Sequence, residues 1–337
     1  MTPPTTATPT AAEARALELL REGGRFVLSG HMRPDGDCIG AQAALASALR
    51  SLGKEVWIVN PDPIGPEFDY LEPAGPYKVF RGGALPVHDV SVLLDCGELS
   101  RCGDLGEALE AEDTRKLVID HHPHDGDAWW DEAFVDVSAS ATGLLVYRIA
   151  QHLGVELDPV AAAGVFTSIV TDTGWFKYSN TDAETLRVAG ALVERGVEPS
   201  PLFTSIYQRR GREHPLDTAE VLASTEYHAG GRLAVICAPR RNDGGAVSLD
   251  ADDALDILRS VGSVEVVLYL RELAAGLVKL SARSKTTFDV NALARRFGGG
   301  GHRKASGATI EGELEGVRQA LVGAALEAIE SGGASPR

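Results

Sequence analysis

The sequence has few cysteines, few aromatic residues and no long apolar run. No stretch approaches the length of about 18 apolar residues that a membrane-spanning helix needs. The four cysteines (Cys38, Cys96, Cys102 and Cys237) form no CxxC pair and no disulfide-framework spacing, which favours free thiols in a reducing compartment. The first residues lack the basic and apolar regions of a signal peptide. We therefore expect a cytoplasmic protein with no membrane partner.

Basic residues are also scarce, with 32 Lys+Arg against 48 Asp+Glu and a formal net charge of −16. Proteins that bind long nucleic acids neutralise many phosphates with Lys and Arg, so this balance argues against such a partner. It still allows a short or small anionic substrate held by metal ions and a few local arginines. The Walker pattern GxxxxGK[ST] is absent, and no GxGxxG opens a helix after the first predicted strand.

Length and apolar patterning predict two domains in this chain of 337 residues. Four apolar runs within residues 13–196 (RFVLSG, KEVWIVN, VSVLLDCG and KLVIDHH) predict strands, and they alternate with amphipathic segments. This alternation predicts an α/β domain with a mainly parallel sheet and flanking helices. Residues 197–216, which are polar and contain proline, are interpreted as a linker to a smaller α+β domain at 217–331. We expect disorder in the Thr/Pro-rich segment 1–12 and in the tail 332–337.

Aspartate and histidine residues follow the predicted strands and one apolar helix. They are His31, Asp35 and Asp37 after RFVLSG, Asp95 at the end of VSVLLD, Asp120, His121 and His122 at the end of KLVIDHH, and Asp172 at the end of GVFTSIVTD. Open α/β sheets bind ligands beyond the carboxyl ends of their strands, so these side chains should converge. Four carboxylates cannot share a small pocket unless cations neutralise them. The pattern predicts a two-metal phosphoesterase centre.

Each of these residues has an ordinary alternative when it is taken alone. PDGD is a common turn, because Pro fixes φ and Gly allows a positive φ. Strand-terminal aspartates and paired histidines are also frequent in solvated loops. The metal-site interpretation depends on these residues occurring together, since three strand ends and one helix end all carry side chains of the types that bind metals.

A second candidate site is the glycine-rich segment GGGGHRKASGA. A glycine run by itself is typical of a helix C-cap or a flexible turn. Here phosphate donors follow the glycines directly, and an arginine ends the preceding predicted strand, where it can clamp a phosphate with two hydrogen bonds. We therefore predict an anion-binding loop. Its candidate residues are Arg283, Gly300, Gly301, His302, Arg303 and Ser306, with Lys304 beside them.

Five motifs, in order, resemble those of one family. HMRPDGDCIG, VLLDCG, IDHH and TDTGWFKYSNT are similar to the four motifs of the DHH phosphoesterase superfamily, and GGGGHRKASGA resembles the glycine-rich signature of its accessory domain, DHHA1. The resemblance extends from about residue 15 to residue 325. The length and the two-domain layout resemble the stand-alone nanoRNase/pAp-phosphatase group (NrnA type).

The resemblance implies a ligand set for two metal ions at the matching positions. One ion would be held by His31, Asp35 and Asp95. The other would be held by Asp37, Asp95, His121 and Asp172, so that Asp95 bridges the two. A mixed oxygen and nitrogen set suits Mn²⁺, with Mg²⁺ or Co²⁺ as substitutes.

The resemblance also implies the catalytic roles beside the ions. In a two-metal centre the attacking group is water, so no Ser or Cys nucleophile is needed. His122 would face the substrate phosphate, as a donor or as the acid that assists the leaving group, and Asp120 would orient a ligand histidine. Arg283 and the loop at 300–302 would hold a second phosphate or the nucleotide on the 3′ side.

The implied function is hydrolysis of very short RNA to mononucleotides from one end, with removal of the 3′-phosphate of 3′-phosphoadenosine 5′-phosphate (pAp) as a further activity. The expected partners are short oligoribonucleotides, dinucleotides and pAp. The sequence allows a homodimer without fixing the oligomeric state. An alternative is a phosphodiesterase for cyclic di-AMP or linear dinucleotides. A RecJ-like single-strand DNA exonuclease would need further binding domains and basic surface, which this acidic chain lacks.

Overall fold

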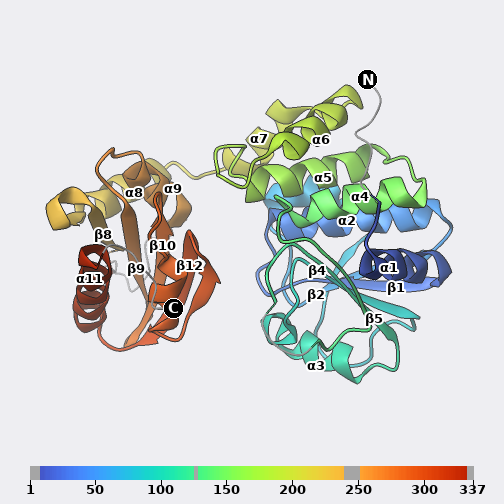
Figure 1. The fold of residues 1–337 in the computed structure, drawn as a ribbon, viewed down its shortest axis with the longest axis horizontal. Helices are drawn as coiled ribbons and strands as arrows, with labels where there is room; N and C mark the ends of the chain where they lie inside the picture. Colours follow the sequence, from blue (N-terminus) through green and yellow to red (C-terminus); the bar gives the residue numbers. More distant parts are fainter. Residues whose placement is uncertain (1–7, 125–127, 239–250, 332–337) are drawn as a thin grey trace. The chain divides into compact units, whose positions relative to one another are not determined.

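The computed structural model describes residues 8–124, 128–238 and 251–331. The chain divides into two compact units, residues 1–209 and 210–337, and each unit has its own hydrophobic core (Figure 1). Segments 1–7 and 332–337, which hold most of the residues expected to be disordered, lie outside the described residues.

The first unit is built on a six-stranded sheet in the order β3-β2-β1-β4-β5-β6, and every pairing in it is parallel. Its strands are β1 (Arg25–Ser29), β2 (Glu55–Asn60), β3 (Tyr77–Val79), β4 (Val90–Leu94), β5 (Arg115–Asp120) and β6 (Glu132–Val135). The predicted parallel sheet is confirmed, and the four apolar runs form its four central strands. The edge strands β3 and β6 are short and only partly buried, so no apolar run marked them in the sequence.

Helices cover both faces of this sheet (Figure 1). They are α1 (Ala11–Glu22), α2 (Gly36–Ser51), α3 (Asp104–Ala111), α4 (Thr142–Leu153), α5 (Pro159–Asp172) and α6 (Ala183–Glu194), with short 3-10 segments η1 (Pro66–Ala74) and η2 (Leu99–Cys102). Phe26 and Leu28 of β1 pack into the core formed with α1, α2, α4 and α5, whereas Val27 between them packs against Leu105 and Leu109 of α3. Burial on both faces explains why the strand is apolar without alternation.

Helix α1 begins inside the segment 1–12, which composition predicts to be disordered. The Thr10 hydroxyl accepts a hydrogen bond from the Glu13 amide at 3.3 Å, and the Glu13 carboxylate accepts one from the Thr10 amide at 2.7 Å. This capping box satisfies two amide donors at the start of the helix. The helix therefore starts at Ala11.

Residues 197–216, which the sequence presents as a linker, are largely helical. Helix α7 (Pro199–Tyr207) packs against η1, with Leu202 buried and the Ser205 hydroxyl donating to the Glu67 carbonyl at 3.0 Å. Helix α8 begins at His214. Both helices have a proline in the first turn, where its missing amide hydrogen costs nothing. The prolines that suggested a linker are thus helix starts.

The second unit has a mixed six-stranded sheet in the order β11-β12-β10-β9-β8-β7. Its elements are α8 (His214–Ala223), β7 (Glu226–His228), η3 (Ala229–Gly231), β8 (Leu233–Ala238), α9 (Ala251–Arg259), β9 (Val266–Ala274), β10 (Leu277–Ser284), α10 (Val290–Arg295), β11 (Gly300–His302), β12 (Ala305–Glu311) and α11 (Leu314–Glu330). Strands β9 and β10 form the antiparallel pair that the sequence predicts. Residues of α10 and α11 pack on one face of the sheet, and those of α8 and α9 on the other.

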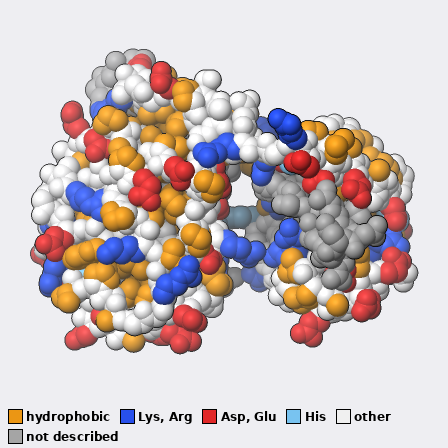
Figure 2. Space-filling view, turned by 180° about the vertical axis from the view of Figure 1, so that it is seen from behind, with side chains coloured by type: hydrophobic (Ala, Val, Ile, Leu, Met, Phe, Trp, Pro, Cys, Tyr) orange, Lys and Arg blue, Asp and Glu red, His pale blue; other side chains and the backbone are white. Residues whose placement is uncertain are grey.

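Within the described residues, no helix is both long enough and apolar enough to cross a membrane. On the face of the first unit drawn in Figure 2, acidic, basic and apolar side chains are interspersed. A long single strand of nucleic acid needs a positive groove that follows its backbone, whereas this face of the unit carries a mixture of charges.

Helices α2 and α5 approach each other closely where two glycines meet. A Cβ atom at Gly40 would lie 2.3 Å from the Gly164 carbonyl oxygen, and a Cβ at Gly164 would lie 2.6 Å from the Gly40 carbonyl oxygen. Both obstacles are backbone atoms, which cannot move aside without shifting a helix. Because α2 carries Asp37 and α5 carries Asp172, this crossing fixes the distance between the two carboxylates.

We expect Gly40→Ala to destabilise the protein by about 1–3 kcal/mol, since even a methyl group must push α5 away from α2. Gly190→Ala is the matched control. Gly190 lies on the exposed side of α6 with no atom within 4 Å of an added Cβ, so alanine should stabilise that helix by about 0.5–1 kcal/mol. Urea denaturation of the two variants measures both effects. Equal stability of Gly40→Ala and the wild type would show that the helices can separate freely.

Candidate metal centre

The candidate residues of the first unit lie at the carboxyl ends of three adjacent strands. Strand β1 lies between β2 and β4, and β4 pairs with β5. The chain continues from β1 to β2 on one side of β1, and the later strands β4 and β5 are added on the other side. This is the switch point of an open parallel sheet, where ligands bind. Ligand-type atoms gather there in three groups, each within 4.8 Å. The groups are His31 with Asp35 and Asp95, Asp37 with His121 and Asp172, and Asp95 with His121 and His122.

The PDGD turn after β1 is the start of α2. Asp35 caps this helix, and its Oδ1 atom accepts hydrogen bonds from the Asp37 amide at 3.0 Å and from the Cys38 amide at 3.2 Å. The Asp35 side chain remains 63% exposed, while Asp37 in the first helical turn is buried. The motif is therefore both a turn and a helix start, and the cap leaves the Asp35 carboxylate exposed while Asp37 is buried within the unit.

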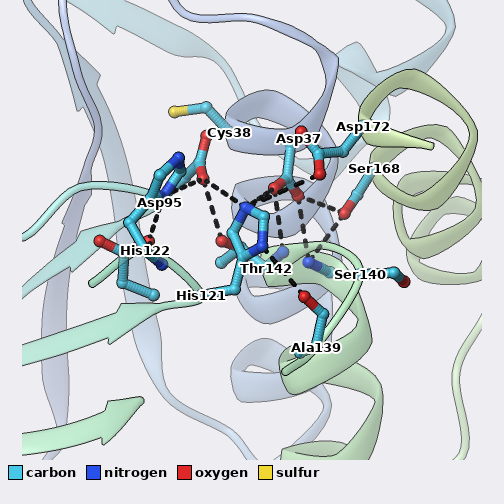
Figure 3. A network of polar contacts seen from close by, with 12 residues as sticks. Asp37, Cys38, Asp95, His121, His122, Ala139, Ser140, Thr142, Ser168 and Asp172 are labelled. Carbon is cyan, nitrogen blue, oxygen red and sulfur yellow. Dashed lines mark hydrogen bonds and ion pairs between the residues drawn. The ribbon is translucent and has the colours of Figure 1, made fainter. Parts of the chain in front are cut away.

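Asp37 is held by three donors from other helices (Figure 3). Its Oδ2 accepts from the Thr142 amide at 2.9 Å, and its Oδ1 accepts from the Gly143 amide at 3.2 Å and from the Ser168 hydroxyl. The Thr142 hydroxyl also donates to Asp95 Oδ1 at 3.1 Å, so a single residue at the start of α4 fixes two carboxylates.

These supporting residues were missed in the sequence. Ser168 precedes Asp172 by four residues on α5, and this spacing puts both side chains on one face of the helix, so a signal was present. Thr142 carried none, because its position depends on how the start of α4 packs against α2 and β4. Asn180, which holds Asp172 Oδ2 at 3.0 Å, lies in the TDTGWFKYSNT motif.

Asp95 lies at the centre of the group. It follows β4 directly, is 2% exposed, and has a φ of 59°, in the left-handed region that few residues other than glycine adopt. Its Oδ2 is 3.3 Å from His31 Nε2, and its Oδ1 is 3.7 Å from His121 Nε2. The unusual backbone turns the carboxylate back over the sheet edge, between the two histidines.

The two histidines are oriented in the same way. His31 Nδ1 donates to the Met32 carbonyl at 2.9 Å, and His121 Nδ1 donates to the Ala139 carbonyl at 3.1 Å. A carbonyl oxygen can only accept, so each Nδ1 carries the hydrogen, and in the neutral ring Nε2 then offers a lone pair. Both lone pairs face carboxylate oxygens, which are also acceptors. A cation between them satisfies both sides.

Asp120 differs from its expected role. It contacts His122 rather than His121, with its Oδ1 at 2.7 Å from His122 Nδ1 and its Oδ2 at 3.4 Å from His124 Nε2. His121 Nδ1 is hydrogen-bonded to the Ala139 carbonyl instead, and both histidine rings lie beside Asp95 Oδ1. His122 Nδ1 also lies 3.5 Å from Asp95 Oδ1. The sequence did not identify His124.

The electrostatics of the cluster favour bound cations. Burial, together with the carboxylates of Asp37 and Asp35, raises the pKa of Asp95 well above its usual range. The same causes raise the pKa of Asp172. Divalent cations remove this penalty, and four carboxylates with two imidazole nitrogens form a donor set that hard and borderline metals accept. The residues present therefore fit a metal centre.

The glycine-rich segment of the second unit forms a tight hairpin of β11 and β12. Gly301 has a φ of 138°, and a Cβ there would lie 2.7 Å from the Ala305 carbonyl, so the backbone requires glycine at this position. His302 pairs with Ala305, and Ala305 pairs with Arg283, which places His302 and Arg283 on the same face.

Two residues of the predicted anion loop are engaged elsewhere. Ser306 pairs with Ala282, so it lies on the opposite face from Arg283, where it is buried and its hydroxyl donates to the His302 carbonyl at 2.6 Å. The Arg303 guanidinium donates to the Thr287 carbonyl at 3.0 Å. The expectation for Ser306 as a phosphate donor is corrected by the strand register, since each step along a strand changes the face.

Comparison with known proteins supports this layout. Residues 25–169 match the family described as DHH family, N-terminal domain, and residues 233–331 match the DHHA1 domain. The bifunctional oligoribonuclease and PAP phosphatase NrnA of Thermus thermophilus is 35% identical over 315 residues, which cover 88% of this chain and 90% of that protein. The protein of the same name from Bacillus subtilis is 27% identical over 291 residues, covering 85% and 89%.

A solved structure has the same fold. The crystal structure of an exopolyphosphatase-related protein from Bacteroides fragilis aligns with a TM-score of 0.86 at 23% sequence identity, and the alignment covers 96% of this chain and 98% of that one. The sequence match to the Thermus protein over most of both chains, together with the two domain matches in order, identifies the family. This chain is a member of the DHH family, with an N-terminal DHH domain followed by a DHHA1 domain.

Proposed function

We propose that this protein is a metal-dependent phosphoesterase that hydrolyses short oligoribonucleotides to mononucleotides from one end and also removes the 3′-phosphate of pAp. The main support for the proposal is that four aspartates and two histidines converge at the switch point of a parallel sheet. They are Asp35, Asp37, Asp95, Asp172, His31 and His121. The names of the Thermus and Bacillus relatives, oligoribonuclease and PAP phosphatase, support the substrate class. All four cysteines are free thiols, which supports a cytoplasmic location.

Two divalent ions would be held by the side chains of the first unit. One set is His31, Asp35 and Asp95, and the other is Asp37, Asp95, His121 and Asp172. Asp95 belongs to both sets, because its two carboxylate oxygens face different histidines. Mixed oxygen and nitrogen donors suit Mn²⁺, with Mg²⁺ or Co²⁺ as substitutes. When bound, such a pair of ions supplies positive charge that stabilises the attacking and leaving oxygens of the displacement at phosphorus.

His122 and Asp120 form the acid that assists departure of the leaving group. Burial raises the pKa of Asp120, but the hydrogen bonds that it accepts from His122 outweigh this effect and hold the pKa of Asp120 below the usual value. Asp120 therefore stays a carboxylate and accepts a hydrogen bond from Nδ1 of His122 at 2.7 Å. The hydrogen bond between Asp120 and His122 Nδ1 orients the ring so that Nε2 points away from Asp120. Nε2 can then give a proton to the leaving oxygen.

The second unit would bind the phosphates of the substrate that are not being cleaved. Arg283 and His302 lie on one face of the sheet, and the backbone at Gly300 and Gly301 allows close approach. Arginine suits this role because its planar guanidinium offers paired donors to a phosphate. We thus assign catalysis to the DHH unit and substrate holding to the DHHA1 unit.

The proposed substrate class is tested by initial rates on pAp, RNA 3-mers, RNA 20-mers and cyclic di-AMP with Mn²⁺. We expect release of mononucleotides from the 3-mer, phosphate release from pAp, and slow turnover of the 20-mer at physiological salt. A 20-mer degraded as fast per end as the 3-mer would contradict the preference for short RNA. Faster turnover of cyclic di-AMP than of the 3-mer would favour the dinucleotide phosphodiesterase instead.

The bridging role of Asp95 is tested by Asp95→Asn, which keeps the shape and removes the charge. In the wild type, Mn²⁺ at 100 times its dissociation constant should raise the free energy of unfolding by about 2.7 kcal/mol. The variant should lose this gain and retain less than a tenth of the activity, whereas its metal-free form should be at least as stable as the wild type because one buried like charge is gone.

Thermal unfolding with and without Mn²⁺ gives the stability readout, and hydrolysis of the 3-mer gives the activity. Asp69→Asn is the control, because Asp69 is exposed on η1, remote in sequence from the cluster residues. The bridging assignment is wrong if Asp95→Asn keeps the full stabilisation by Mn²⁺.

Thr142 should position the two carboxylates that it contacts. Thr142→Val keeps the shape of the side chain and the hydrogen bond from the backbone amide of residue 142 to Asp37. It removes the hydroxyl that donates to Asp95. We expect Mn²⁺ affinity to fall about 10- to 100-fold, as is usual when a group that orients a metal ligand is lost. Thr142→Ser retains the hydroxyl and should restore the affinity. Calorimetric titration with Mn²⁺ measures the affinity of each variant. An affinity of Thr142→Val equal to that of the wild type would contradict the positioning role of Thr142.

A further inference from the structure

The segment that follows α5 in the first unit reverses the chain with consecutive residues in a left-handed conformation. Gly174, Trp175 and Phe176 have φ values of 55°, 60° and 65°. Left-handed residues normally occur singly and are mostly glycine, because a Cβ atom crowds the following carbonyl oxygen. Bulky residues in this region are outliers. Two aromatic residues in succession, shortly after the proposed metal ligand Asp172, therefore make this a strained turn.

The strained turn brings Asn180 back to Asp172. The Asn180 amide nitrogen donates to Asp172 Oδ2 at 3.0 Å, to the Asp172 carbonyl at 3.2 Å and to the Ser140 carbonyl at 3.0 Å. Asp172 Oδ2 in turn lies 3.9 Å from His121 Nε2. The conformation of the turn therefore determines where the Asp172 carboxylate lies in the acidic cluster.

Aromatic contacts support the turn. The Trp175 ring lies 6.2 Å from the ring of Phe166 on α5, and the Phe176 ring lies 6.3 Å from the same phenylalanine. Trp175 also meets two rings of α7, Phe203 at 4.9 Å and Tyr207 at 5.8 Å. All four pairs are edge-to-face, the arrangement that aromatic quadrupoles favour. Strained backbone persists only where its surroundings hold it in place, and here the surrounding rings do so.

The support from α7 comes from a short helix that is itself partly exposed. Phe203 and Tyr207 are each 36% exposed. Helix α7 ends at Tyr207, close to the point where the first unit ends at residue 209. Elements with exposed side chains and little buried surface are the ones that open locally at low cost in free energy. The docking of α7 and the conformation of the turn are therefore coupled through Trp175.

We propose that Trp175, supported by Phe203 of α7, is a positioning residue for Asp172, so that docking of α7 and metal binding by Asp172 strengthen each other. This inference rests on the proposed function and deepens it. When α7 leaves, the strained turn loses its support and relaxes, which separates Asn180 from Asp172. A metal ion held by Asp172 opposes this relaxation and keeps α7 docked. By thermodynamic linkage the two effects have the same size.

Two substitutions of Trp175 separate this role from ordinary packing. Trp175→Leu removes the aromatic ring but keeps a Cβ atom, so the turn keeps its strain and loses its support. Trp175→Gly removes the ring and the strain together, because glycine adopts a positive φ freely. If the ring only filled space, glycine would be the worse replacement, since it leaves the larger cavity. If the ring supports a strained turn, leucine is the worse replacement.

Trp57→Leu is the matched control. Trp57 is a half-buried tryptophan on β2 of the same unit, where it packs against the cluster that contains Val27 and Leu105. Its replacement removes the same ring away from the turn. Each full-length variant is titrated with Mn²⁺ by calorimetry. Hydrogen exchange of the α7 amides is measured by mass spectrometry with and without Mn²⁺, in the wild type and in Trp175→Leu.

We expect Trp175→Leu to bind one of the two Mn²⁺ ions about 10- to 100-fold more weakly, the range usual when a group that orients a metal ligand is lost. Trp175→Gly should bind that ion more tightly than Trp175→Leu does, and Trp57→Leu should match the wild type. In the wild type, saturating Mn²⁺ should slow exchange of the α7 amides by about the same factor. In Trp175→Leu, Mn²⁺ should have little effect on this exchange.

Three outcomes would overturn the role of Trp175. They are wild-type affinity for both ions in Trp175→Leu, weaker Mn²⁺ binding by Trp175→Gly than by Trp175→Leu, and exchange of the wild-type α7 amides that Mn²⁺ leaves unchanged. The exchange measurement on the wild type needs no variant, so it decides the matter even if a substitution unfolds the protein. A wild-type protein that binds no Mn²⁺ would instead overturn the proposed metal centre, so the two failures are distinguishable.

Discussion

The carboxylates of Asp37, Asp95 and Asp172 repel one another in a part of the molecule where water screens them poorly. Burial and this repulsion raise the pKa values of Asp95 and Asp172, so the cluster costs energy unless positive charge compensates it. The surrounding structure meets this cost with donors. Amides at the start of α4, the Ser168 hydroxyl and the Thr142 hydroxyl all point at carboxylate oxygens. Bound cations, as we propose, would offset the repulsion that these donors leave.

The rest of the fold serves to hold that cluster in place. Adjacent parallel strands deliver His31, Asp95 and His121 to one edge, because β1, β4 and β5 are neighbours in the sheet. The contact between Gly40 and Gly164 brings α2 and α5 close enough for their aspartates to face the same histidine. In the second unit, the glycine at position 301 allows a tight β11–β12 hairpin, and the register of this hairpin puts His302 on the same face as Arg283.

Much of this could be predicted from the sequence, and the exceptions have physical causes. Buried parallel strands are continuous apolar runs, so β1, β2, β4 and β5 were recognisable, and the residues at their ends marked the site. Short edge strands and the helical segment around α7 have no such runs. The roles of Thr142 and Ser168 depend on how helices distant in the sequence pack together. Ser306 was assigned without considering strand alternation, which puts it on the opposite face from Arg283. Asp120 contacts His122, and no pattern in the sequence showed which histidine it would meet.

The central claim is that the acidic cluster holds two divalent ions that share Asp95. Anomalous diffraction from crystals of the protein grown with Mn²⁺ tests it most directly. The account predicts two anomalous peaks in the first unit, one beside His31 and Asp35 and the other beside His121 and Asp172, with the Asp95 carboxylate in contact with both. A single peak, or two peaks of which only one contacts Asp95, would contradict it.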